Sequence, residues 1–278
     1  MVREHRIRLR PLTCRAVADD FFVTCTAGQR CSRGTESKAM TTRREILVGS
    51  LVLGGAAVAQ PAGKGGGIAA PARGDAFLGK HTPKPLPFDP KKLTGISEKL
   101  IVSHHDKNYA GAVKNLNQVE EALAQITPDT PGFTVSGLEA AKLKFTNSMI
   151  LHEMYFQNLG GDGHGVGSAT EKALVQAYGS HARWEELFRA LGNSLGGGSG
   201  WAILDWDFHA RGARIYWAGD HTTALAFGAP LLVMDMYEHA YAMDYGASAK
   251  DYIDAFFKNI NWPEVDRRLA AWGNVPGQ

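Results

Sequence analysis

The hydrophobic pattern of this chain changes its period at Trp201, and that change limits the fold more than any other feature. Before Trp201, apolar residues recur at helical spacings. After it, short apolar runs bounded by turn residues are typical of strands. Helices followed by strands and then by further helices predict an α+β fold.

The expected elements follow from the same pattern and from its breaks at proline and glycine. A turn around Ala210–Gly212 would join the first two strands, and Gly160–Gly167 is a glycine-rich loop. The predicted helices are 96–126, 138–158, 169–177, 182–195, 248–258 and 262–271, and the predicted strands are 201–206, 213–217 and 231–235.

A short apolar run near the N-terminus has the layout of an export signal. Arg43 and Arg44 precede an apolar, small-residue stretch from Ile46 to Ala59. The arginine pair followed by Ile46-Leu47 resembles the twin-arginine type of signal. The stretch is shorter than the roughly 20 residues that a membrane-spanning helix needs. We therefore expect a periplasmic or secreted protein without stable membrane insertion after processing; an uncleaved anchor and a chance pattern are the alternatives.

The N-terminal segments divide around this signal. Met40 directly precedes it, so residues 1–39 are interpreted as an upstream extension and 40–59 as the signal. Residues 60–85 are rich in glycine, proline, alanine and lysine without apolar periodicity, which predicts a flexible leader.

Charge and cysteine usage look different once the signal is set aside. The whole chain of 278 residues carries a formal charge of +2, but residues 1–59 hold 10 of its 30 basic and 5 of its 28 acidic side chains. Residues 60–278 therefore have a net charge of −3, which gives no indication of nucleic-acid binding. All three cysteines also precede residue 40, so disulfides and thiolate chemistry are excluded from the mature part.

Four residues in unusual settings could form a metal site. His104 is expected on the first helix and His152 on the apolar face of the second, whereas Asp235 ends an apolar strand and His239 follows four residues later. A carboxylate at the end of a buried strand is costly unless it is paired or coordinated. Three imidazoles and one carboxylate suit iron or manganese, and zinc is chemically feasible. From spacing alone, a hydrogen-bonded core His152 and a helix-capping Asp235 remain alternatives.

Several motifs together resemble the iron/manganese superoxide dismutase family, over about Leu86 to Leu269. No single motif suffices, but all fall in the family's order with similar spacings. They are Leu86-Pro-Phe-Asp89, His104-His-Asp-Lys107 with Asn115-Leu-Asn117, His152 through Leu159, Gly198-Ser-Gly-Trp201, Asp235-Met-Tyr-Glu-His-Ala-Tyr241 and Asn259-Ile-Asn-Trp262.

The resemblance implies a helical-hairpin domain (86–160) followed by an α/β metal-binding domain with a small antiparallel sheet (161–278). It implies that His104, His152, Asp235 and His239 bind one iron or manganese ion per subunit, with a solvent molecule as fifth ligand and no further cofactor. It also implies dismutation of superoxide to dioxygen and hydrogen peroxide. Glu238 matches the residue that reaches the metal-binding histidine of the partner in a homodimer; its alternative reading is an exposed helix carboxylate.

The resemblance also assigns one residue near the metal and shows where this chain departs from the family. His221, after Asp220, matches the position that hydrogen-bonds the metal-bound solvent; a surface histidine is the rival reading. The usual funnel tyrosine and histidine are Ala112 and Asn108, and the tyrosine that pairs with this histidine across the dimer is Ala242. Two usual tryptophans are Tyr237 and Phe156, and Tyr109 is a shifted aromatic that could fill the gap.

These departures leave three functional hypotheses. The intact ligand set favours an exported superoxide dismutase, with altered rate, pH dependence or peroxide sensitivity. The altered funnel favours a catalytically weak or inactive dismutase-like protein that binds metal or a partner. Peroxide chemistry at the same metal is the third. A histidine at position 221 leans toward iron by resemblance alone, and the residues do not decide between iron and manganese or between dimer and tetramer.

Overall fold

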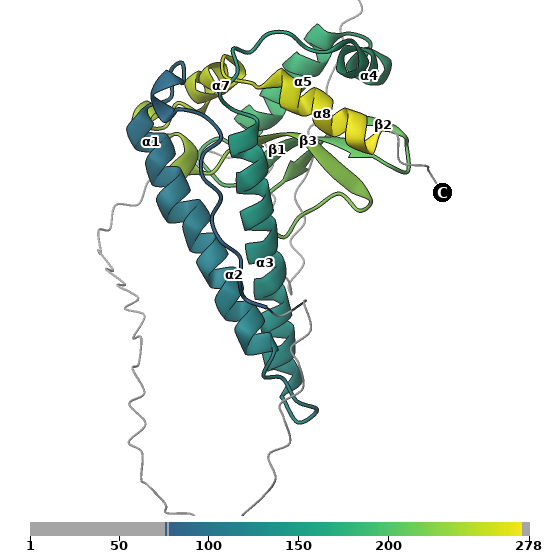
Figure 1. The fold of residues 1–278 in the computed structure, drawn as a ribbon. Coiled ribbons are helices and arrows are strands. Elements are labelled where there is room, and N and C mark those ends of the chain that lie inside the picture. Colours follow the sequence, from purple (N-terminus) through teal and green to yellow (C-terminus); the bar gives the residue numbers. More distant parts are fainter. Residues whose placement is uncertain (1–75, 77, 274–278) are drawn as a thin grey trace, which may run out of the picture. The chain divides into compact units, whose positions relative to one another are not determined.

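The predicted order of helices and strands is confirmed in a computed structural model that describes residues 76 and 78–273. The chain forms a helical region first and a three-stranded antiparallel sheet with further helices afterwards (Figure 1). The helices are α1 (Glu98–Ser103), α2 (Ala110–Leu123), α3 (Gly132–Gln157), α4 (Ser168–Tyr178), α5 (His181–Ser194), α6 (Ala242–Tyr245), α7 (Ala249–Phe257) and α8 (Trp262–Trp272). The strands are β1 (Trp201–Asp207), β2 (Gly212–Ala218) and β3 (Gly228–Asp235). This is the α+β fold of the prediction.

The helical region is a hairpin of α2 and α3, which lie side by side in Figure 1. The predicted helix 96–126 is divided in the structure: α1 and α2 are separated by a π-helical turn, His104–Tyr109. Such turns often occur at functional sites. The helix predicted from residue 138 begins at Gly132, because Pro131 is its N-cap and proline does not interrupt a helix there.

The sheet has the strand order β2-β1-β3, with β1 antiparallel to both neighbours. Its central strand is buried from Trp201 to Asp205, as expected of a strand paired on both sides. The register of β1 with β3 shifts between Leu204 and Asp205, opposite Pro230, whose nitrogen cannot donate to the ladder. The sheet therefore carries a bulge in the middle of its third strand.

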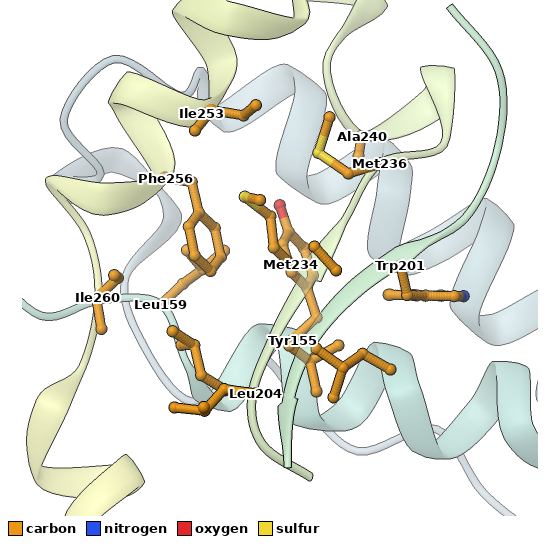
Figure 2. Close-up of a cluster of buried hydrophobic side chains, with 14 of the residues drawn as sticks. Tyr155, Leu159, Trp201, Leu204, Met234, Met236, Ala240, Ile253, Phe256 and Ile260 are labelled. Atoms are coloured by element: carbon orange, nitrogen blue, oxygen red, sulfur yellow. The ribbon is translucent and has the colours of Figure 1, made fainter. Parts of the chain in front are cut away.

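Helices α5 and α7 help to cover the sheet with apolar side chains. Figure 2 shows Ile253 and Phe256 of α7 facing Met234 of β3. Gly192 of α5 leaves room for this packing, because a Cβ there would lie 2.5 Å from the terminal methyl carbon of Met234. The sheet is thus held in place by core packing, which fixes the end of β3 where Asp235 stands.

The leader predicted over residues 60–85 lies largely outside the described residues, as do the extension 1–39 and the signal 40–59. The C-terminal part of this leader, which the structure describes, makes specific contacts, although its composition predicts a flexible segment. The Gly79 nitrogen donates to Glu120 Oε2 at 2.9 Å, and His81 and Asn117 exchange two hydrogen bonds of 2.9 Å. Gly79 and His81 are therefore held against α2. Among the described helices, each is too short or too polar to cross a bilayer.

Candidate metal centre

The four predicted ligands come from four separate elements and meet at one point. His104 opens the π-helical turn, His152 lies in α3, Asp235 is the last residue of β3, and His239 belongs to the short turn Glu238–Ala240. One ligand atom from each lies within 4.8 Å of all the others. No segment of the sequence contains more than two of them, so the group exists only in the folded chain.

The geometry centres on one carboxylate oxygen. Asp235 Oδ2 lies 3.1 Å from His104 Nε2, 3.6 Å from His152 Nε2 and 3.5 Å from His239 Nε2. His104, His152 and Asp235 are buried, and the His239 side chain is 27% exposed. Three imidazole nitrogens therefore converge on one carboxylate in a largely dry site.

Hydrogen bonding at this point is incomplete in a way that fits a metal ion. His152 Nε2 and His239 Nε2 are buried and have no hydrogen-bond partner among the described residues. Buried polar atoms are normally paired, so such atoms need an explanation. Two unpaired ring nitrogens beside a buried carboxylate are the donor set expected for iron or manganese.

Electrostatics put three of the four ligands in the protonation states that metal binding requires. Burial lowers the pKa of His152 to about 3, with His104 adding to the effect. Burial also lowers the pKa of His104. Burial would raise the pKa of Asp235, but His239 and His104 hold it below its ordinary value. Burial would lower the pKa of His239, but Asp235 raises it above its ordinary value. At neutral pH His104 and His152 are therefore neutral and Asp235 is ionised, whereas His239 must give up its proton when it binds a metal.

Two further contacts orient the ligands. The His152 ring donates from Nδ1 to the Ser148 carbonyl at 2.6 Å, one turn earlier in α3, which leaves Nε2 for the centre. Asp235 Oδ1 accepts from the Tyr237 nitrogen at 2.8 Å, which leaves Oδ2 for the centre. His152 and Asp235 thus each use their second polar atom to fix the direction of the first.

Comparison with known proteins agrees with this site. Residues 166–268 match the family model described as iron/manganese superoxide dismutases, C-terminal domain. The superoxide dismutase [Fe] of Cupriavidus metallidurans is 50% identical over 191 residues, which cover 68% of this chain and 95% of that protein. The chain belongs to the iron/manganese superoxide dismutase family. It is accordingly an enzyme of the superoxide dismutase type, with one iron or manganese ion per subunit as its cofactor.

Both metal types occur among the relatives of this dismutase. The superoxide dismutase [Fe] of Aquifex aeolicus is 34% identical over 201 residues, covering 69% of this chain and 93% of that protein. The superoxide dismutase [Mn] 1 of Halobacterium salinarum is 30% identical over 190 residues, covering 66% and 92%.

His221 lies beside the metal group of the dismutase. Its ring centroid is 6.1 Å from that of His152, and its Nδ1 accepts a hydrogen bond from Trp201 Nε1 at 3.0 Å. A neutral ring that accepts at Nδ1 carries its proton on Nε2, where it can donate. Burial lowers the pKa of His221, which favours this neutral form. The predicted contact with a metal-bound solvent molecule stays a prediction.

The two aromatic residues that replace the usual tryptophans both pack against ligand histidines. Tyr237 stacks between His221 and His239, with ring centroids 4.7 and 5.3 Å away. Phe156 lies 5.3 Å from the His104 ring. The aromatic surroundings of the centre are therefore retained with different residues.

Tyr109 is committed to another network, which sequence reasoning missed. Its hydroxyl donates to Glu153 Oε1 at 3.0 Å and accepts from the Lys84 nitrogen at 2.8 Å. Glu153 also pairs with the Lys84 ammonium. Tyr109 thus links the end of the leader to α3 next to His152. The one hint of this network in the sequence is that Glu153 directly follows the predicted ligand His152. At the other departures, Ala112 is buried and Ala242 is exposed.

Proposed function

We propose that this dismutase is exported from the cytoplasm and disproportionates superoxide at a metal held by His104, His152, Asp235 and His239. The observation that carries the ligand assignment is the approach of their four ligand atoms to within 4.8 Å of one another. The bound metal would supply alternate one-electron oxidation and reduction of superoxide, giving dioxygen and hydrogen peroxide.

The protein's own part is to hold the ligands and to handle protons. Asp235 remains ionised and His104 and His152 remain neutral near neutral pH, so a proton competes with the metal only at His239, whose pKa Asp235 raises. His221, held by Trp201, carries an Nε2 proton that it can present to a solvent molecule near the centre. We assign His221 this positioning role.

The ligand assignment is tested by metal analysis and a superoxide assay on the same preparations. We expect about one iron or manganese per native chain and superoxide consumption far above that of free metal. His152→Ala should lose both. His181→Ala is the matched control, because His181 is bonded to Glu171 away from the centre and should leave both unchanged. Substoichiometric metal in the native protein, or full metal in His152→Ala, would contradict the proposal.

Export is supported by the sequence of residues 40–59, which we propose as a twin-arginine signal that directs the protein to the periplasm or beyond. Replacing Arg43 and Arg44 together by lysine should leave the protein in the cytoplasm, because this type of signal is defined by the arginine pair. Arg30→Lys, upstream of the signal, serves as the control. Cell fractionation measures the outcome, and unchanged export of the double variant would sink the idea.

We also propose a homodimer in which Glu238 reaches His239 of the partner. Glu238 is exposed and its side chain has no partner within the described part of the chain. The neighbouring Met243 is 49% exposed, which gives this face an apolar contribution. Sedimentation should give a dimer for the native protein and a weakened dimer for Glu238→Ala, with Glu186→Ala as the control. A native monomer would exclude this role of Glu238.

A further inference from the structure

A second buried carboxyl group lies in the same sheet, away from the metal ligands. Asp205 of β1 is 1% exposed, and its Oδ1 is buried without a hydrogen-bond partner. No group in the described residues donates to its Oδ2 either. A carboxyl group left without partners in the interior is costly, so its presence calls for a reason.

Within the described residues no cation is paired with Asp205: Arg214 of β2 lies opposite it in the strand register, but its guanidinium donates to the Ala213 carbonyl at 2.8 Å. Burial raises its pKa to about 7, and the neighbouring Asp207 on the same strand adds to the effect. Besides Arg214, β2 places Tyr216 on this face, and burial raises the pKa of Tyr216 to about 12, so that its phenol stays neutral. The nearby described residues of α3, β3 and the 223–225 segment are uncharged. The carboxyl group is therefore left without a bonded cation from the described residues, and a small cationic ligand can supply one.

Asp205 lines a pocket with a volume of about 180 Å³. The polar lining includes Tyr216 and Asn147, and the apolar lining includes Ile150, Leu225 and Pro230. Gly228 keeps space beside the carboxyl group, because a Cβ there would lie 2.5 Å from Asp205 Oδ2. The pocket is smaller than the roughly 300–1,000 Å³ typical of sites for drug-sized ligands. It has room for a ligand of a few heavy atoms.

The residues that line the pocket indicate which kind of ligand would bind there. A bare metal ion such as Ca²⁺ needs about six or more oxygen ligands, and this pocket supplies one carboxylate among largely apolar walls. An ammonium group with a short alkyl chain matches both parts: its N–H groups bond to the carboxylate and its carbons lie against the apolar side chains. We propose that the Asp205 pocket is a binding site for a small alkylammonium ligand.

The pocket is separate from the metal centre but adjoins the segment that carries His221. Asn147 Nδ2 donates to the His221 carbonyl at 2.7 Å, and Thr223, Ala224 and Leu225 are part of the lining. None of the four metal ligands lines the pocket. Ligand binding at Asp205 can therefore be measured independently of whether the proposed metal ligands are correct.

The test titrates methylammonium chloride into the metal-loaded full chain and follows the melting temperature, with sodium chloride at equal ionic strength as reference. Binding to the folded state raises the melting temperature with ligand concentration. With a pKa of about 7, Asp205 is about nine-tenths ionised at pH 8 and about one-tenth ionised at pH 6. We expect a saturable rise at pH 8 and an apparent affinity about tenfold weaker at pH 6.

Two variants decide whether Asp205 is the site. Asp205→Asn, which is close in shape but uncharged, should lose the saturable rise. Asp207→Asn, which removes a charge two residues away outside the lining, should keep it. Saturation that persists in Asp205→Asn would overturn the proposal, as would a native protein that responds to methylammonium no more than to sodium.

A crystal structure keeps the test decisive if Asp205→Asn folds poorly. Native crystals soaked in methylammonium should show the ligand nitrogen about 3 Å from the Asp205 carboxylate. A pocket that holds only water under those conditions would overturn the proposal.

Discussion

Asp235 and Asp205 are both buried carboxyl groups on neighbouring strands of one sheet, but their side-chain partners differ. Three histidine rings face Asp235, and the pKa of Asp235 falls below its ordinary value. Among the described residues, none donates a hydrogen bond to Asp205 or forms an ion pair with it, and burial raises its pKa to about 7. Burial pushes both pKa values upward, so the partners decide the charge. The comparison teaches that a buried carboxylate becomes a metal ligand through its neighbours, not through its burial.

The largest effect is expected at Asp235. Asp235→Asn removes the anionic ligand while preserving shape, so metal affinity and superoxide consumption should fall by about 100-fold or more. Asp205→Asn is the matched control and should keep its metal. Elemental analysis of both variants measures the difference. Equal metal content in the two variants would contradict the claim that Asp235, and not Asp205, is a metal ligand.

The next effect concerns stability and pH at Asp205. Because the folded-state pKa is raised, the unfolded chain loses its proton first, and the native protein loses stability as pH rises from about 4 to about 7. The full difference is on the order of 4 kcal/mol. Asp205→Val should remove this loss. The free energy of unfolding of the variant, relative to that of the native protein, should therefore increase between pH 4.5 and 8.

Denaturant unfolding at fixed metal loading checks this prediction. At Asp235 the sign is opposite, because a lowered pKa gives stability that is present above the unfolded-state value and is lost as pH falls below about 4. An Asp205→Val advantage that does not change with pH would show that Asp205 titrates normally in the folded protein.

A smaller effect is expected from closing the pocket while keeping the carboxyl group. In Gly228→Ala the new Cβ would lie 2.5 Å from Asp205 Oδ2 and 2.9 Å from Leu225 Cδ2, so the variant should lose about 1–3 kcal/mol of stability. Gly137→Ala in α3 is the control, because nothing lies within 4 Å of its Cβ position. Unfolding midpoints that move equally in both variants would mean that the region around Asp205 accommodates an added methyl group without steric strain.

The smallest effect is expected from Asp207→Asn. Removing this neighbouring charge should lower the pKa of Asp205 by less than about one unit, because burial is the larger cause of the shift. The midpoint of the stability–pH profile measures it. A fall of the midpoint to the ordinary aspartate range would reverse this ranking and make charge repulsion the main cause.

The sequence predicted most elements because their signals are local. Apolar spacing gave α4, α5, α7 and α8 to within one or two residues, and the alternation after Trp201 gave all three strands. The π-helical turn at His104–Tyr109 and the early start of α3 were not predicted. Both depend on backbone hydrogen bonding that the hydrophobic pattern does not record.

For the site, the sequence by itself determined the residue types and, through the family's motifs, which four residues to consider. Only the tertiary structure decided that His104 and His152 approach Asp235, because hairpin and sheet packing bring together residues up to 131 positions apart. The tertiary structure likewise decided that Tyr109 bonds to Glu153 and that Asp205 has no hydrogen-bond partner in the described part of the chain. Local propensities act over one or two turns of chain, whereas burial and charge depend on every element that packs nearby.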